Sequence, residues 1–187
     1  MNIDWEEQWA LHALNYKNGF AHVEVHGKTY RLKPGPGFGD LSHPTTRLML
    51  SSIPKKISLP VVDIGCGSGV LSLAAFYAGA PKVYGIDIDK ASITHAKENG
   101  KLNQAPIFFG NKLPILNKPC LILMNMISSE QKIAWESHPQ LHSLSKMLII
   151  SGVPEEERDR FLKHSSYGTC VEEKNLDGWH SFKYRRI

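Results

Sequence analysis

The 187-residue chain has little of what marks several large protein classes. It contains only three cysteines, Cys66, Cys120 and Cys170, far apart and without a Cys-x-x-Cys pair, which excludes a disulfide framework or a zinc finger. Its longest apolar stretches, such as residues 120–124 and 147–150, are too short to span a bilayer. The N-terminus is acidic where a secretory signal is basic and then apolar, so we expect a cytoplasmic protein without membrane attachment.

The chain also lacks a strong excess of charge of either sign. The formal net charge of +4 is mildly basic, and short basic clusters such as residues 183–186 are typical of a solvated surface, so a nucleic-acid partner is not indicated. Hydrophobic residues make up 42% of the chain and charged residues 21%, which excludes disorder and fibrous repeats. We therefore expect one domain over residues 1–187.

The first 40 residues differ in pattern from the remainder, and we expect them to form an extension on a core of residues 41–187. Asp4, with Glu7 three positions later, predicts the start of a helix that ends at the C-cap pair Asn18-Gly19. Its Trp5 and Trp9 form either a packing stripe or a lid over a ligand. The extension continues with a hairpin of residues 21–25 and 29–32 and an irregular loop of residues 33–39.

From residue 59 onward the hydrophobic period alternates between strand and helix. Strands are predicted at residues 60–64, 82–87, 107–109, 120–125 and 146–150. Helices are predicted at residues 70–78, 90–102, 129–142 and 154–164. This alternation implies a parallel sheet with helices on both faces. Residues 169–175 and 179–185 break the pattern and predict a closing antiparallel hairpin.

The most informative segment is a buried strand that runs into a glycine-rich loop and then a helix. Residues 61–69 read VVDIGCGSG, with Gly65, Gly67 and Gly69 at alternate positions. Glycine permits the tight turn and lets a ligand approach the backbone closely. A dinucleotide fingerprint needs its third glycine at position 70, where this chain has Val70. The spacing therefore favours a different nucleotide-like ligand.

Two acidic residues accompany the glycine loop. Asp87 is predicted to close the next strand, 22 residues after Gly65, where a carboxylate suits hydrogen bonding to two ribose hydroxyls. Asp63 precedes the loop by two residues and is expected either to hold the loop amides or to face an amino group of the ligand. A tight turn without a ligand would not explain three glycines together with the ribose-type carboxylate.

Four segments, in order, narrow the family. They are PGFG (36–39) with HPTT (43–46), DIGCGSG (63–69), GIDID (85–89) and LILMNMI (121–127). From about Leu32 to the C-terminus, through residues 151–152 and Trp179, the chain resembles the catalytic domain of the PrmA-type methyltransferases, which methylate a ribosomal protein. The resemblance implies the α/β fold of class I methyltransferases: a Rossmann-like, mostly parallel seven-stranded sheet with a C-terminal antiparallel hairpin. It also implies S-adenosyl-L-methionine as cofactor and S-adenosyl-L-homocysteine as product.

Carried over by position, the family's cofactor contacts fall on Thr46, Gly65, Asp87 and Asn125. Two departures qualify the resemblance. The family has Phe-Gly-Thr-Gly before the residue that precedes His, whereas residues 38–43 read FGDLSH and so add the carboxylate of Asp40. Only about 30 residues precede the resemblance, so we expect the family's separate N-terminal recognition domain to be missing. The ribosomal substrate therefore does not transfer as securely as the cofactor.

Three residues are candidates for catalysis. Asn125, at the carboxyl end of its strand, could accept a hydrogen bond from an attacking amine and orient the amine's lone pair. Asp40 either binds a cationic acceptor or caps its turn. His43 either transfers a proton or packs to order its loop. An amine acceptor must lose its proton because a lysine is charged at neutral pH.

The acceptor that these residues favour is a protein amine, with a ribosomal protein as one possibility, or a small-molecule amine. One alternative is an RNA methyltransferase, although no concentrated basic and aromatic patch is present. The other is a degenerate relative that binds the cofactor without catalysis. No metal site is predicted, because His22, Glu24 and His26 alternate in the manner of a solvated strand face. Cys66 is interpreted as a small space-filler.

Overall fold

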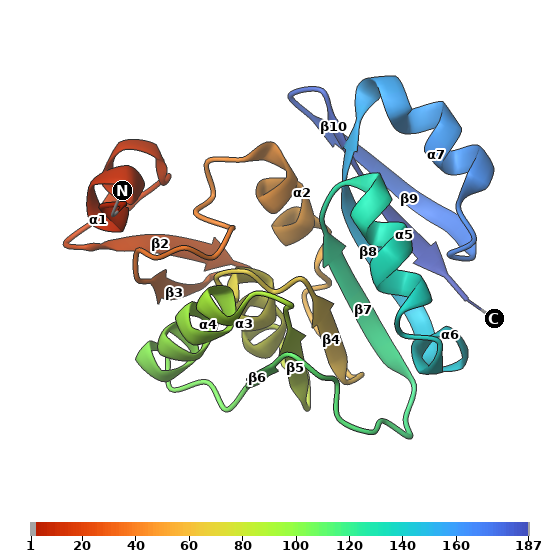
Figure 1. Ribbon diagram of the computed structural model, residues 1–187, viewed down its shortest axis with the longest axis horizontal. Coiled ribbons are helices and arrows are strands. Elements are labelled where there is room, and N and C mark those ends of the chain that lie inside the picture. Colours follow the sequence, from red (N-terminus) through yellow and green to blue (C-terminus); the bar gives the residue numbers. More distant parts are fainter. Residues whose placement is uncertain (1–2, 187) are drawn as a thin grey trace.

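A seven-stranded sheet forms the centre of the computed structural model, which describes residues 3–186 (Figure 1). Its strands in spatial order are β6 (Phe108–Gly110), β5 (Val83–Ile86), β4 (Val61–Ile64), β7 (Cys120–Asn125), β8 (Ser145–Pro154), β10 (Trp179–Arg185) and β9 (Thr169–Leu176). Neighbours from β6 to β8 are parallel, whereas β10 is antiparallel to both β8 and β9. The mostly parallel sheet with a closing hairpin is thus confirmed.

The two faces of the sheet carry separate apolar clusters because successive side chains of a strand point to opposite sides. Val61 and Leu123 pack on the face covered by α2 (Pro44–Ser52) and α3 (Val70–Tyr77). Val62 and Met124 pack on the other face with side chains of α5 (Ser128–Glu136), α6 (Gln140–Leu144) and α7 (Arg158–His164). In α4 (Lys90–Leu102), Ile93 and Ala96 pack against Cys66 and Phe109.

The N-terminal helix is shorter than predicted. As expected, α1 (Trp5–His12) begins at Asp4, whose carboxylate accepts hydrogen bonds from the amides of Glu6 and Glu7. The predicted end at Asn18-Gly19 is wrong, because this pair forms the two-residue turn between β1 (Tyr16–Lys17) and β2 (Phe20–Val25), with φ of 54° and 79°. Helix C-caps and hairpin turns both use left-handed backbone at such residues, so the local sequence favours the two equally.

Both hairpins predicted from the sequence are confirmed. β2 pairs with β3 (Lys28–Leu32) around His26-Gly27, and β9 pairs with β10 around Asp177-Gly178. Each turn has positive φ at both central residues, as a two-residue hairpin loop requires. β1, β2 and β3 form a separate three-stranded antiparallel sheet.

Two further helical predictions differ from the structure, and one helix was not predicted. The predicted helix 129–142 is divided into α5 and α6 because Pro139, which lacks an amide hydrogen, lies between them. The predicted helix 154–164 begins later, because β8 extends through Pro154 and a 3-10 turn, η1 (Glu155–Glu157), precedes α7. α2 was not predicted, although Pro44 occupies a preferred first helical position.

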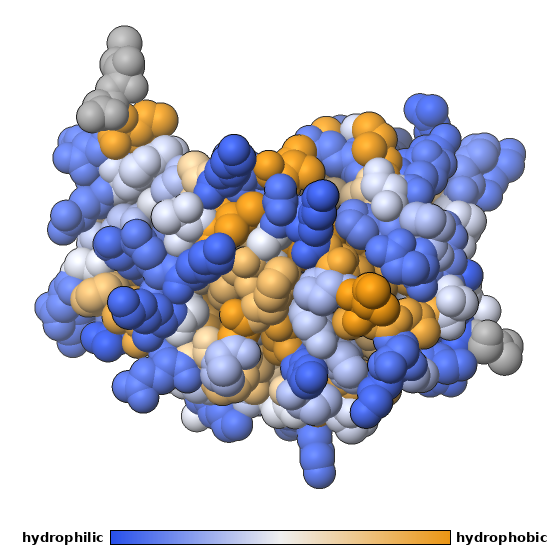
Figure 2. All heavy atoms as spheres, turned by 60° about the horizontal axis from the view of Figure 1, so that its bottom comes forward, coloured by the Kyte–Doolittle hydropathy of each residue, from blue (hydrophilic) through white to orange (hydrophobic). Residues whose placement is uncertain are grey.

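The amino-end side of the sheet carries apolar side chains at its surface. Figure 2 brings the lower side of Figure 1 forward and shows these side chains at the centre of the face, with hydrophilic side chains around them. Ile115, in the connection between β6 and β7, is fully exposed. Within residues 3–186, no helix has both the length and the apolar character needed to cross a membrane.

Candidate functional site

The predicted site residues meet at the carboxyl ends of three neighbouring strands. The glycine loop (residues 65–69) follows β4, Asp87 follows β5 and Asn125 ends β7. Because β5, β4 and β7 are adjacent and parallel, these three points lie at one edge of the sheet, where ligands bind in such folds. The connection from β3 to α2, residues 33–43, reaches the same edge (Figure 1). We call this connection the strap.

The strap and the glycine loop touch through their backbones. The Ser68 amide donates a hydrogen bond of 2.9 Å to the Phe38 carbonyl. A Cβ at Gly67 would lie 2.6 Å from the Phe38 oxygen, and a Cβ at Gly37 would lie 2.5 Å from the Gly67 carbonyl carbon. Glycine is therefore needed at both positions for the strap to lie against the loop. Sequence reasoning connected Gly67 with ligand approach, but its Cα faces the strap.

The five amides of the glycine loop all have partners inside the protein. Gly65 and Cys66 donate to the Ile86 carbonyl, Gly67 to Asp87, Ser68 to Phe38, and Gly69 to the Cys66 carbonyl. Loops that cradle phosphates keep such amides free for the anion. The glycine loop therefore suits a nucleoside ligand without a phosphate at this point, in agreement with the glycine spacing.

Asp87 and Asp63 have different environments. The two Asp87 oxygens accept the amides of Gly67 (2.9 Å) and Asp89 (3.0 Å), and each oxygen retains a lone pair at a half-buried position. Asp63 is 1% exposed, and one oxygen accepts a 2.6 Å hydrogen bond from the Ser72 hydroxyl. Burial raises the pKa of Asp63 to about 7. Asp87, rather than Asp63, therefore holds the loop amide.

Four polar groups at this edge have no partner within the described residues. The hydroxyls of Thr46 and Ser68 and one oxygen of Asp63 are buried without a hydrogen bond. The half-buried Asn125 side chain has no hydrogen bond to any residue from 3 to 186. Because buried polar groups normally find partners, a ligand or water is expected beside Thr46 and Asp63. Thr46 and Asn125, which the family resemblance assigns to the cofactor, thus have polar side-chain atoms free to form hydrogen bonds with a ligand.

A row of aromatic rings joins the strap to the C-terminal hairpin. The His43 ring lies edge-to-face against Phe38 (5.6 Å between centroids) and against Trp179 (4.9 Å). His43 also caps α2, because its Nδ1 accepts the Thr45 amide at 3.3 Å. This bond places the proton of the neutral ring on Nε2, and burial lowers the pKa of His43. Of the two roles considered for His43, the geometry favours ordering the strap.

Asp40 caps the turn that precedes α2. One carboxylate oxygen accepts hydrogen bonds from the Ser42 amide (3.0 Å) and hydroxyl (2.7 Å). The neighbouring Leu41 is buried in a left-handed conformation, with φ of 73°. The second Asp40 oxygen makes no hydrogen bond within residues 3–186, so a substrate role remains compatible with capping.

Two further sequence interpretations are settled by packing. Trp9 is 4% exposed and its ring nitrogen donates to the Gly35 carbonyl at 3.1 Å, so it packs beneath the strap. Cys66 is 4% exposed among apolar side chains, and burial raises its thiol pKa well above the ordinary value. The thiol therefore stays protonated and fills space rather than acting as a nucleophile.

His95, which contacts the strap from α4, was not found from the sequence, because a single histidine in a helix carries no local signal.

Comparison with known proteins agrees with this geometry. The family model described as ribosomal protein L11 methyltransferase (PrmA) matches residues 16–186, so the match begins within the N-terminal sheet. A ribosomal protein L11 methyltransferase of Dictyoglomus thermophilum is 34% identical over 158 residues, covering 79% of this chain and 52% of the relative. One of Teredinibacter turnerae is 32% identical over 188 residues, covering 90% of this chain and 61% of the relative. The chain thus spans between half and two thirds of the length of these relatives.

A solved structure supports the same assignment. The ribosomal protein L11 methylase of Lactobacillus delbrueckii subsp. bulgaricus is 26% identical with a TM-score of 0.70, and the alignment covers 93% of this chain and 92% of that one. The fold is that of the class I S-adenosylmethionine-dependent methyltransferases. Within this class, the chain belongs to the ribosomal protein L11 methyltransferase (PrmA) family.

Proposed function

We propose that the chain is an S-adenosylmethionine-dependent methyltransferase that methylates an amine nitrogen of a protein, with ribosomal protein L11 as the first candidate and the cytoplasm as its location. The observation that carries this proposal is the glycine loop, whose amides are all bonded internally and whose Gly67 amide is held by Asp87. Such a loop fits a nucleoside cofactor without phosphates. The family and the names of its relatives support both the reaction and the substrate.

The residues at the edge of the sheet fit the parts of this cofactor. The remaining lone pairs of Asp87 would accept the two ribose hydroxyls. Ile88, the next residue, is 98% exposed and offers an apolar surface to the adenine ring. The unpaired Thr46 hydroxyl would bond a polar group of the cofactor. Together with Gly65 of the loop, Asp87 and Thr46 form the proposed cofactor contacts.

The acceptor would enter beside Asn125 and the aromatic row. When bound, S-adenosylmethionine supplies an electrophilic methyl group on sulfur, so the protein needs chiefly to orient the amine and exclude water. The Asn125 carbonyl would accept a hydrogen bond from the neutral amine and direct its lone pair. Trp179 and the free oxygen of Asp40 would favour a cationic amine on its approach, through cation–π and Coulomb attraction.

The test is methyl transfer to defined acceptors. The chain, labelled S-adenosylmethionine and purified ribosomal protein L11 should give L11 with label on amine nitrogens, located by peptide mass spectrometry. Free lysine, unmodified ribosomal RNA and L11 with acetylated amines are the comparison acceptors, and we expect none to equal L11. Preferential labelling of RNA would establish the RNA alternative. Cofactor binding without transfer to any acceptor would establish a catalytically degenerate protein.

Asn125→Ala provides a check on the orienting role. The variant should lower kcat roughly tenfold or more, equivalent to about 1.4 kcal/mol of transition-state stabilisation, while the affinity for S-adenosylhomocysteine falls less. Asn125→Asp keeps an acceptor oxygen and should recover part of the rate. Unchanged turnover on L11 in the Ala variant would exclude Asn125 as the group that orients the amine.

A further inference from the structure

His95 is a buried side chain of α4 that holds the first part of the strap from below. It is 3% exposed, and its Nδ1 lies 3.0 Å from the Gly37 amide, which donates to it. Because Nδ1 accepts this hydrogen bond, the ring proton lies on Nε2, which donates to the Lys33 carbonyl at 2.7 Å. A Cβ at Gly35 would lie 2.6 Å from the imidazole. Glycine at position 35 therefore lets the strap pass directly over the ring.

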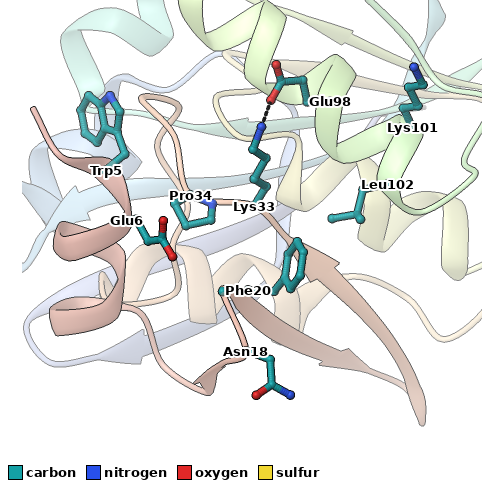
Figure 3. Close-up of a pocket in the computed structure, with 10 residues that line it drawn as sticks. Trp5, Glu6, Asn18, Phe20, Lys33, Pro34, Glu98, Lys101 and Leu102 are labelled. Carbon is teal, nitrogen blue, oxygen red and sulfur yellow. Dashed lines mark hydrogen bonds and ion pairs between the residues drawn. The ribbon is translucent and has the colours of Figure 1, made fainter.

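The contacts around His95 connect the strap to the glycine loop. Asn99, one helical turn further along α4, accepts the Lys33 amide at 2.8 Å and donates to the Ser68 carbonyl at 2.9 Å. The Trp9 ring lies edge-to-face against His95, with 5.6 Å between centroids. Figure 3 shows the Lys33 ammonium pointing to the Glu98 carboxylate, 2.9 Å away, at the solvent side. The start of the strap is thus fastened to α4 beside the glycine loop.

We propose that His95 is a proton-sensitive positioning residue: its neutral ring holds the strap against the glycine loop, and its protonation releases the strap and weakens cofactor binding. The release of the strap depends only on the contacts of His95, Lys33 and Gly37. The weakening of cofactor binding rests in addition on the proposed function, because Gly37 and Phe38 lie against the loop that would bind the cofactor.

Protonation of His95 acts on the strap through the bond to Gly37. A proton on Nδ1 would face the Gly37 amide donor, so an acceptor is lost in a buried position. The charged groups that face His95 are Glu98, which raises its pKa, and Lys33, which lowers it, and they form an ion pair with each other. Trp9, whose ring packs against His95 from α1, does not titrate in this range.

The direction of the pH effect follows from burial, the largest influence on this ring. Burial lowers the pKa of His95 below the ordinary value of 6.5, since a charged imidazole is disfavoured out of water. The unfolded chain therefore takes up the proton first as pH falls. The stabilisation given by neutral His95 is complete above pH 6.5 and is lost as pH falls from there through the lower pKa of the folded state.

Two substitutions distinguish the effect of protonating His95 from the effect of losing its hydrogen bonds to the strap. In His95→Asn the side-chain oxygen replaces Nδ1 as acceptor for the Gly37 amide but cannot be protonated in this range. In His95→Ala both hydrogen bonds are lost at every pH. His164→Asn is the matched control, because His164 is exposed on α7 and, among residues 3–186, its ring bonds only the Arg160 carbonyl of its own helix.

The experiment measures amide hydrogen exchange of the strap, residues 33–43, without ligand, at about pH 5 and about pH 8. All variants are compared at the same pH, so intrinsic exchange rates cancel. We expect the parent and His164→Asn to match His95→Asn at the higher pH and to exchange at least tenfold faster than it at the lower pH. His95→Ala should exchange fast at both. Equal strap exchange in the parent and His95→Asn at the lower pH would overturn the proposal.

Binding of S-adenosylhomocysteine, measured by calorimetry on the same proteins, tests the coupling. The parent should lose at least tenfold more affinity than His95→Asn between about pH 8 and about pH 5, while titration of Asp63 and His43 affects both proteins alike. A folded His95→Ala that binds as tightly as the parent at the higher pH would contradict the positioning role. If no variant binds at any pH, the proposed function fails, and strap exchange alone decides the role of His95.

Discussion

The edge of the sheet has two regions of different construction. The cofactor region, at the ends of β4 and β5, is closed by hydrogen bonds in which all five amides of the glycine loop donate to partners within the protein. The acceptor region, at the strap and the start of β10, is held by ring contacts among Phe38, His43 and Trp179. A cofactor that a whole family shares suits a region held rigidly by backbone and carboxylate hydrogen bonds, whereas acceptor specificity suits side chains that come together from distant segments.

The largest effect is expected where the two regions meet, at Gly67. Gly67→Ala places a Cβ 2.6 Å from the Phe38 oxygen in a left-handed backbone, whereas Gly178→Ala has a similar positive φ with nothing within 4 Å. The control should lose about 1–2 kcal/mol of unfolding free energy from backbone strain alone. Gly67→Ala should lose more and should bind S-adenosylhomocysteine at least a hundredfold more weakly. Equal losses in the two variants, measured by urea unfolding and calorimetry, would show that the strap contact is unimportant.

Asp87 tests the cofactor region by itself. Asp87→Ala should weaken binding of S-adenosylhomocysteine by about 2–4 kcal/mol, because charge-assisted hydrogen bonds to the ribose and to the Gly67 amide are lost. Asp89→Ala is the neighbouring control: it removes the cap of α4 and should lower Tm while leaving affinity nearly unchanged. Calorimetric titration that finds the same affinity for Asp87→Ala as for the parent would show that the pocket is elsewhere.

Asp63 gives the cofactor region a pH dependence of opposite sign to that of His95. Burial raises the pKa of Asp63 to about 7 in the folded protein, so the folded state binds more protons than the unfolded state between about pH 4 and about pH 7. The contribution of Asp63 to stability should therefore fall by about 2–4 kcal/mol as pH rises through this window and level off above it. Urea unfolding of the parent and Asp63→Asn from pH 5 to pH 8 measures this contribution. If the unfolding free energies of the two proteins run parallel across this range, the predicted pH dependence is contradicted.

Asp40 should give the smallest effect, within the acceptor region. Asp40→Asn keeps an oxygen to accept from Ser42 but removes the charge, whereas Asp40→Ala removes both. If the charge attracts the amine, Asp40→Asn should raise the acceptor KM roughly fivefold, or about 1 kcal/mol, with Tm unchanged. If Asp40 only caps, the Asn variant should behave as the parent and only the Ala variant should lose stability, by about 1 kcal/mol.

The same division explains which parts of the structure could be predicted from the sequence. The glycine loop, Asp87 and the alternation of strands and helices follow from short motifs and alternating hydrophobic periods, because each of these features depends on neighbours close in the chain. Asn18-Gly19 was misassigned because a helix end and a hairpin turn need the same backbone conformation. The pairing of Tyr16 with Ala21, a contact outside the dipeptide itself, decides between them.

Contacts between side chains far apart in the sequence could not be predicted from local sequence patterns. His95 bonds Gly37, 58 positions away, and Trp179 meets His43 from the last hairpin. The different roles of Asp63 and Asp87 were also hidden, since both are carboxylates near the carboxyl end of a strand, β4 for Asp63 and β5 for Asp87. Only the fold shows that Asp63 is buried under α3 with Ser72 while Asp87 reaches the Gly67 amide.

Calorimetric titration of the parent chain with S-adenosylhomocysteine and, separately, with NAD tests the central claim most directly. The internally bonded glycine loop should bind S-adenosylhomocysteine at one saturable site and should reject NAD, whose pyrophosphate would find no free amide among residues 65–69. Absence of S-adenosylhomocysteine binding, or NAD binding of equal strength, would contradict the account.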